Sequence, residues 1–135
     1  EGIKHVYLDI LKKGDKETFS ALSLDNIVPE LKDWIFNVFT AKKVKQNIRS
    51  KVLVSSKYSK AYRKLDKKHL RESLILPYEK YPFQVEIDLY DENKIAFISF
   101  DPSELLGVII ESPRIANTLK SLFNLVWDAH RNRLK

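Results

Sequence analysis

The chain contains no cysteine and no methionine, and only 3 of its 135 residues are glycine. Without cysteine it can form neither disulfides nor thiolate metal sites, and it has no cysteine nucleophile. It also lacks the glycine-rich loop that cradles phosphate in nucleotide-binding proteins. These absences remove several enzyme classes before any residue that is present is considered.

Long apolar runs are missing as well. No run approaches the roughly 18 residues that a membrane span needs, and the N-terminus lacks the basic-then-apolar layout of a secretory signal. We therefore expect a soluble, cytoplasmic protein without membrane contact, which agrees with the lack of cysteine. A natural reading frame begins with methionine, so a chain that opens Glu1-Gly2 is expected to be a piece of something longer.

The length allows one domain, residues 1–135, because 44% hydrophobic residues in a chain of this size supply one core and not two. Hydrophobic periodicity predicts an α/β fold whose mixed sheet has helices on both faces. The helices are expected at residues 3–11, 27–46, 58–65 and 113–131. The strands are expected at residues 17–23, 48–54, 74–76, 84–90, 94–100 and 105–110.

The ends of the helices carry recognisable signals. Gly14 suits the left-handed turn that follows a helix, so it is expected to close the first one. Asp25 or Asn26 is a candidate cap for the second helix. Ser112 can cap the last helix, and Pro113 fits its first position, where no amide hydrogen is needed.

The stretch from residue 83 to residue 127 organises the rest. Apolar and polar residues alternate over 84–90, which predicts a half-buried strand. Turn residues at 91–93 are followed by the nearly continuous apolar run 94–100, which is typical of a strand covered on both sides. The second apolar run, 105–110, predicts another buried strand.

Three carboxylates are candidates for chemistry. Glu86 and Asp88 lie two residues apart and so share one face of a strand, and Glu111 ends a later strand. Together they would line a polar cleft able to bind sugar hydroxyls, a metal or a cationic ligand, or to act as acid and base. The simpler interpretation is that Glu86 and Asp88 face solvent, and the residues alone leave both open.

Charge is concentrated in residues 42–71, which hold 12 Lys or Arg against the single acid Asp66. A basic segment with Tyr58 and Tyr62 interleaved can contact phosphates and stack on bases. The simpler interpretation is a solvated helix face with a lysine-rich loop, because charge runs commonly serve solubility.

Other motifs for catalysis are weak. His5, His69 and His130 are far apart and show no ligand spacing, so neither a metal nor another cofactor is expected. Serines near strand ends lack a Gly-x-Ser-x-Gly elbow and a neighbouring histidine. We expect no catalytic residue.

Four segments carry a family resemblance. They are Asn93-Lys94-Ile95-Ala96-Phe97-Ile98-Ser99-Phe100, Gly107-Val108-Ile109-Ile110-Glu111-Ser112, Ile115-Ala116-Asn117-Thr118 and Phe123-Asn124-Leu125-Val126-Trp127. In these segments, and more loosely over the whole chain, the sequence resembles the C-terminal regulatory domain of TrmB-like transcriptional regulators. The resemblance implies a phospholipase D-like fold behind an N-terminal winged helix-turn-helix that this chain lacks. It also implies a homodimer that binds a small molecule, typically a sugar, and so alters DNA binding by the missing domain.

Active phospholipase D-like enzymes carry His-x-Lys-x4-Asp on the strand that enters the hairpin, and the corresponding positions here are Gln84 and Glu86. An amide cannot form the phosphoenzyme, and a carboxylate repels a phosphodiester. The expected function is therefore a non-catalytic effector-binding or dimerisation domain. Strand-face geometry and the lost motif select the candidate ligand-binding residues Gln84, Glu86, Ser99 and Glu111. The alternative is a degenerate nuclease-like fold that binds nucleic acid through residues 42–71.

Overall fold

Six strands form one sheet in the computed structural model, which describes residues 2–13, 16–25, 27–57 and 59–131. The strand order is β3-β2-β1-β4-β5-β6. The strands are β1 (Glu17–Leu22), β2 (Arg49–Ser55), β3 (Arg71–Leu76), β4 (Glu86–Tyr90), β5 (Lys94–Ser99) and β6 (Leu106–Glu111). β1, β2 and β3 are parallel, whereas β4, β5 and β6 pair antiparallel with their neighbours. The predicted mixed sheet is confirmed.

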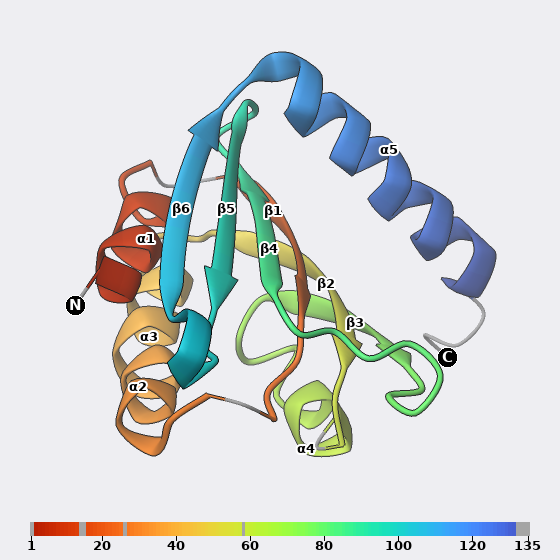
Figure 1. Ribbon diagram of the computed structural model, residues 1–135, viewed down its shortest axis with the longest axis horizontal. Coiled ribbons are helices and arrows are strands. Elements are labelled where there is room, and N and C mark those ends of the chain that lie inside the picture. Colours follow the sequence, from red (N-terminus) through yellow and green to blue (C-terminus); the bar gives the residue numbers. More distant parts are fainter. Residues whose placement is uncertain (1, 14–15, 26, 58, 132–135) are drawn as a thin grey trace.

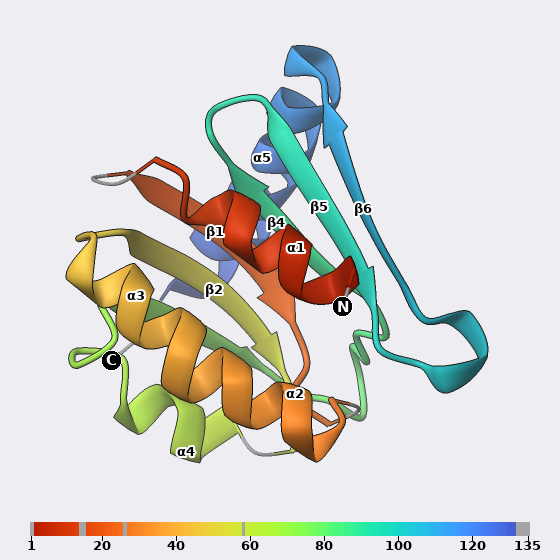
Figure 2. The same ribbon diagram turned by 90° about the vertical axis from the view of Figure 1, so that its left-hand side faces the viewer.

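Helices cover both faces of this sheet, as predicted (Figures 1 and 2). They are α1 (Gly2–Ile10), α2 (Pro29–Trp34), the π-helical η1 (Ile35–Phe39), α3 (Thr40–Lys45), α4 (Ser59–Lys64), the short η2 (Pro102–Glu104) and α5 (Pro113–His130). α1 to α4 share one face. The two parallel crossovers move the same way along the sheet, and right-handed connections then put both on one side. Within the described ranges, no helix is long and apolar enough to cross a membrane.

α5 alone covers the other face, and aromatic side chains dominate that contact. Phe123 and Trp127 are buried against Leu53 and Leu74, while Ala116 packs on strands β4 and β5. The sequence signals for this helix are confirmed: Ser112 Oγ accepts a hydrogen bond from the Ile115 amide at 3.2 Å, and a proline occupies the first turn. α5 begins at the end of β6 and crosses the sheet obliquely (Figure 1).

The second predicted helix is one continuous helical segment, α2-η1-α3, with a π-helical turn in its middle. Its cap differs from the prediction. Val28 precedes the first turn and makes no side-chain cap hydrogen bond, whereas Asp25 accepts from the hydroxyl of Ser56 at 2.7 Å. The carboxylate of Asp25 therefore makes a tertiary hydrogen bond instead of capping the helix. The other two helix-end candidates, Asn26 and Gly14, lie outside the described residues.

Burial of the strands departs from the sequence pattern in two places. The polar face of β4 is not solvated, because Glu86 and Asp88 are 5% and 3% exposed and the α1–α4 layer covers them. The strand predicted at residues 105–110 was expected to be buried, and this is wrong. β6 is an edge strand with one neighbour, so Leu106, Val108 and Ile109 stay exposed at 40 to 43%. β5, by contrast, is covered on both sides as predicted.

Candidate functional site

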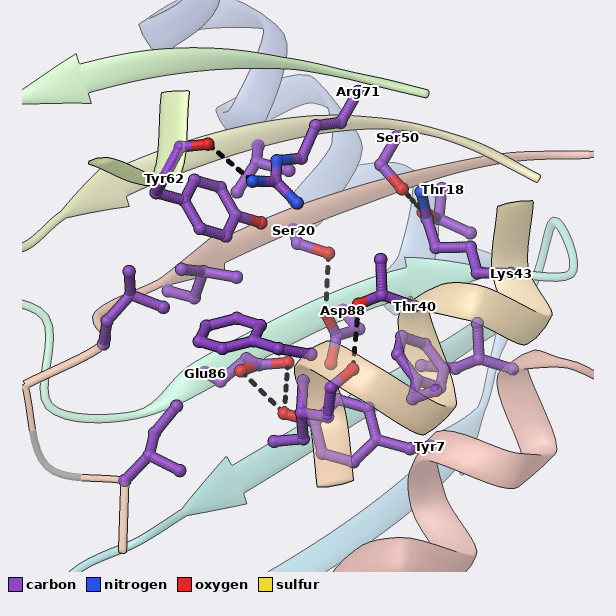
Figure 3. A pocket seen from close by; sticks show the side chains of 18 residues that line it. Tyr7, Thr18, Ser20, Thr40, Lys43, Ser50, Tyr62, Arg71, Glu86 and Asp88 are labelled. Atoms are coloured by element: carbon purple, nitrogen blue, oxygen red, sulfur yellow. Dashed lines mark hydrogen bonds between the residues drawn. The ribbon is translucent and has the colours of Figure 1, made fainter. Parts of the chain in front are cut away.

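A cavity of about 70 Å³ lies between the sheet and the α1–α4 layer (Figure 3). α1, η1, α3 and α4 contribute to its wall. The strands contribute alternate residues, because only every second side chain of a strand faces this side. Polar side chains gather here although the surroundings are apolar. The polar lining consists of Tyr7, Thr18, Ser20, Thr40, Lys43, Ser50, Tyr62, Arg71, Glu86 and Asp88.

Glu86 is held by a tyrosine from the opposite layer. The hydroxyl of Tyr7, on α1, donates to both carboxylate oxygens, with O···O distances of 2.9 and 3.0 Å (Figure 3). Burial raises the pKa of the Tyr7 hydroxyl well above its ordinary value, and the negative charges of Glu86 and Asp88 raise it further. Tyr7 therefore keeps its proton and acts as a donor over the whole physiological range.

Asp88 is only partly satisfied. Its Oδ1 accepts a hydrogen bond from the hydroxyl of Ser20 on the neighbouring strand β1, at 2.6 Å. Its Oδ2 is fully buried and accepts from no hydroxyl or N–H group of the described residues. A buried carboxylate oxygen in this state costs free energy unless a neighbouring acid shares its proton or a ligand supplies a donor.

The two carboxyl groups share one environment and hold a proton between them. Burial raises the pKa of Glu86 well above its usual range, and the neighbouring charge of Asp88 adds to this. Burial also raises the pKa of Asp88, although hydrogen bonds from Glu86 and Ser20 favour its charged form. Glu86 is therefore the protonated member of the pair, because like charges this close in a low-dielectric interior do not both ionise. No described cation forms an ion pair with either group.

Basic side chains lie in another part of the same lining. Lys43 donates to the carbonyl oxygen of His69 at 2.9 Å, and burial together with the charge of Arg71 lowers its pKa to about 8. The guanidinium of Arg71 stacks 3.5 Å from the ring centroid of Tyr62 and pairs with Asp66 at 2.9 Å. The cavity is thus lined by an acid pair, two cations and several hydroxyl groups.

The π-helical turn shapes the cover of the cavity. In η1 the amide of Thr40 bonds back five residues to the carbonyl of Ile35, and the Thr40 hydroxyl donates to the same oxygen at 2.8 Å. The extra residue in the turn alters the helical phase. Phe36, Phe39, Thr40 and Lys43 consequently all line the cavity, together with Ile35.

The four residues predicted to bind a ligand are not all brought together. Only Glu86 lines the cavity. Gln84 precedes β4, which begins at residue 86, and its exposed side chain borders a second, small hollow near Phe100, which Glu86 also lines. Ser99 is buried, but strand alternation with Phe97 turns it to the α5 face. Glu111 is exposed at the far end of the edge strand, opposite Lys94.

The basic segment 42–71 does not form one solvated surface. Lys43 and Arg71 turn inward to the cavity, and Lys51 lies over the ring of Trp127 on the opposite face of the sheet. Tyr62 lines the cavity beneath a guanidinium, so the ring face that the guanidinium covers is closed to a base. The other tyrosine proposed to stack on bases, Tyr58, lies outside the described residues.

The sequence pattern drew attention to Asp88 but missed the partners of the acid pair. Tyr7 looked like one apolar position in a helical stripe, and Ser20 like a small residue in a strand. A usable signal was present on β1 and β2, where the small hydroxyl residues Thr18, Ser20 and Ser50 occupy alternate positions, and the hydroxyls of Thr18 and Ser50 lie 2.8 Å apart. Among the described residues, no group of three or more His, Asp and Glu side chains is arranged to hold a metal ion.

No protein-family model matches the chain, and no curated protein is significantly similar to it. The resemblance to TrmB-like regulators therefore stays a prediction.

Proposed function

We propose that this chain is a non-catalytic effector-binding domain of a TrmB-like transcriptional regulator, and that the effector binds in the cavity beside Glu86 and Asp88. In this proposal the fold is phospholipase D-like, the protein acts in the cytoplasm as a homodimer, and DNA is bound through another domain. The effector changes the stability of one arrangement of the dimer, because only differential binding can shift such an equilibrium.

The observation that carries the proposal is the incomplete satisfaction of the buried acid pair. Asp88 Oδ2 lacks a hydroxyl or N–H donor within the described residues, although it is fully buried. Polar groups buried at this depth are normally paired, and unpaired ones mark sites completed by a ligand, a water or a shared proton. A ligand donor at this oxygen would take the place of the proton shared with Glu86.

The lining defines the class of ligand. A hydroxyl or ammonium donor suits the acid pair, and Lys43 can donate to an acceptor group of the same molecule. At about 70 Å³, the cavity has room for roughly five water molecules, whereas ligand pockets usually measure about 300–1,000 Å³. A small polyol or amino alcohol fits this space. A complete sugar would enter only if the α2-η1-α3 cover moved outward.

The proposed domain is non-catalytic because it lacks the His-x-Lys motif of active phospholipase D-like enzymes. Gln84 and Glu86 stand where an active enzyme of this fold has its histidine and lysine, and the whole chain contains no His-x-Lys. Glu86 moreover lies beside a second carboxyl group. A phosphodiester would meet negative charge at the position where the chemistry requires a cation.

Thermal unfolding in the presence of small hydroxylated and amine metabolites tests the proposal. A ligand at one hundred times its Kd stabilises the folded state by about 2.7 kcal/mol, which raises the melting temperature measurably. We expect Asp88→Asn to abolish the shift, because an amide replaces the unpaired acceptor with a donor. Glu111→Gln is the matched control, since it removes an exposed carboxylate outside the cavity. A shift that survives Asp88→Asn would contradict the assignment.

Direct nucleic-acid binding by the basic segment is the competing function, and the same protein tests it. Salt-dependent binding of this chain to arbitrary DNA, weakened by Lys60→Ala and Lys64→Ala, would favour that alternative. Both lysines are exposed on α4. The proposed effector domain predicts no such affinity for this chain.

A further inference from the structure

Exposed apolar side chains are concentrated near the end of the chain. Of the 13 large hydrophobic residues that are exposed among the described residues, 7 lie between positions 105 and 125. They belong to the edge strand β6, the residue before it and helix α5. A concentration of this kind on a folded domain marks an interaction surface.

α5 carries a second apolar stripe in addition to the one that packs on the sheet. Its inner stripe contains Ala116, Phe123 and Trp127, which are buried. A separate stripe consists of Ile115, Thr118, Leu122, Leu125 and Ala129, all exposed. The spacings in this second set are three, four, three and four residues, which is the seam of a helix pair that packs knobs into holes.

The second stripe faces along the uncovered part of the sheet. Leu119, three positions before Leu122, packs on the same cluster as Phe97 and Ile110 of the β5–β6 hairpin, and Val126, four positions after it, packs on the same cluster as Phe83. Leu122 therefore projects from the flank of α5 that borders this region. On the same face of β6, Leu106 and Val108 are 40% and 43% exposed.

We propose that this surface is a homodimer interface in which α5 packs antiparallel against α5 of a second copy, about a two-fold axis near Ser121. The inference deepens the proposed function, on which it rests for the expectation that two copies associate. In this arrangement Ile115 meets Leu125 of the other copy, and Leu122 lies near the axis. A standard interface buries about 800 Å² of each partner, which is roughly a tenth of a small protein's surface. The solvent-accessible surface of this protein is 8255 Å².

Charge complementarity selects the antiparallel orientation and a copy of this chain as the partner. Arg114 and Asp128 flank the stripe on the same side, 14 residues apart, with Ser121 midway between them. Antiparallel packing places Arg114 of each copy beside Asp128 of the other, twice per dimer, whereas parallel packing would leave both facing apolar positions. Neither side chain forms an ion pair within the part of the chain that the structure describes.

Sedimentation equilibrium of the 135-residue chain tests the interface. We expect a dimer that Arg114→Asp weakens about tenfold or more, because two pairs of like charges then meet. Asp128→Arg should do the same, and the double variant Arg114→Asp/Asp128→Arg should restore association. Asn124→Asp, a charge change on the exposed side of α5 away from the stripe, should have no effect. Circular dichroism verifies that each variant is folded.

Cross-linking locates the axis independently, because the chain has no cysteine of its own. Ser121→Cys should be joined to its copy by a short bis-maleimide, and Asn124→Cys should not. A chain that stays monomeric at every concentration overturns the interface, as does a dimer that is indifferent to the charge exchange. Effector binding is scored separately, by the Asp88-dependent melting shift, so either proposal can fail while the other stands.

Discussion

The two faces of the sheet are built differently. On the α5 face, aromatic rings pack on one another: the ring of Phe123 meets that of Phe19 on β1 edge-on at 5.2 Å and stacks on that of Trp127 at 5.7 Å, centroid to centroid. On the α1–α4 face, the same sheet buries two carboxyl groups and a cavity. Apolar burial stabilises the fold, whereas buried carboxyl groups cost stability unless they are paired. In the proposed function, the α5 face stabilises the domain and the other face binds the effector.

The largest effect is expected on the α5 face. Phe123→Ala removes a ring that is 6% exposed and leaves a cavity beneath the helix. We expect the free energy of unfolding to fall by about 3–5 kcal/mol, measured by urea denaturation. A loss below about 1 kcal/mol would be far outside the range for a buried aromatic side chain. It would contradict the conclusion that the α5 face stabilises the domain.

A smaller effect is expected where the cavity face is polar. Tyr7→Phe keeps the ring but removes the hydroxyl group that, among the described residues, donates to Glu86. We expect a loss of about 1–3 kcal/mol, the cost of leaving a buried polar group unsatisfied. Tyr81→Phe is the control, because Tyr81 is 42% exposed. Equal effects of the two substitutions would show that the hydroxyl of Tyr7 contributes nothing.

The pH dependence of stability tests the acid pair on the cavity face of the sheet without any substitution in the core. Because the pKa values of Glu86 and Asp88 are raised in the folded state, the folded protein binds more protons than the unfolded chain above about pH 4. Stability should therefore fall as pH rises from about 4, by at most about 1.4 kcal/mol per pH unit for one proton.

Glu86→Gln should flatten this slope, since it removes the group that holds the proton. The two proteins should be compared at each pH below 8, because burial lowers the pKa of His69 and lowers the pKa of Lys43 to about 8, and both contributions have the opposite sign. Between the folded and unfolded pKa values of such a group the folded state binds fewer protons, so stability rises with pH there. The contribution of His69 is common to both proteins and cancels in the difference. A wild-type slope that matches the variant's would contradict the shared proton.

The smallest effect is expected at a candidate that the fold leaves outside the cavity. Glu111→Gln should change the free energy of unfolding by less than about 0.5 kcal/mol, as exposed substitutions usually do. Chemical denaturation at pH 7 measures it. A change above about 1 kcal/mol would mean that the edge of β6 contributes to the fold more than its exposure indicates.

The sequence predicted the elements better than the site. Ser112 and Pro113 marked the start of α5 because capping depends on neighbours within one turn. Alternation correctly placed Glu86 and Asp88 on one face of β4. It did not reveal whether that face is exposed to solvent, because the helical layer that buries it includes Tyr7, which lies 79 residues from Glu86 in the chain.

The sequence also did not predict that β6 lies at the edge of the sheet. The run 105–110 has the composition of a buried strand, and composition does not record how many neighbours a strand acquires. The same limit explains the site candidates, which were chosen from strand positions. Ser99 faces α5, and Glu111 lies at the far end of the edge strand, away from the cavity.

By itself, the sequence determined a single α/β domain, its helix starts and strand periods, and the absence of a His-x-Lys motif. Those properties depend on residue identity and on interactions within a few positions. Only the tertiary structure decided that Asp88 has a buried oxygen without a hydroxyl or N–H donor in the described chain, and that α5 exposes a second apolar stripe. Both depend on which surfaces meet, because burial and pairing belong to contacts between distant segments.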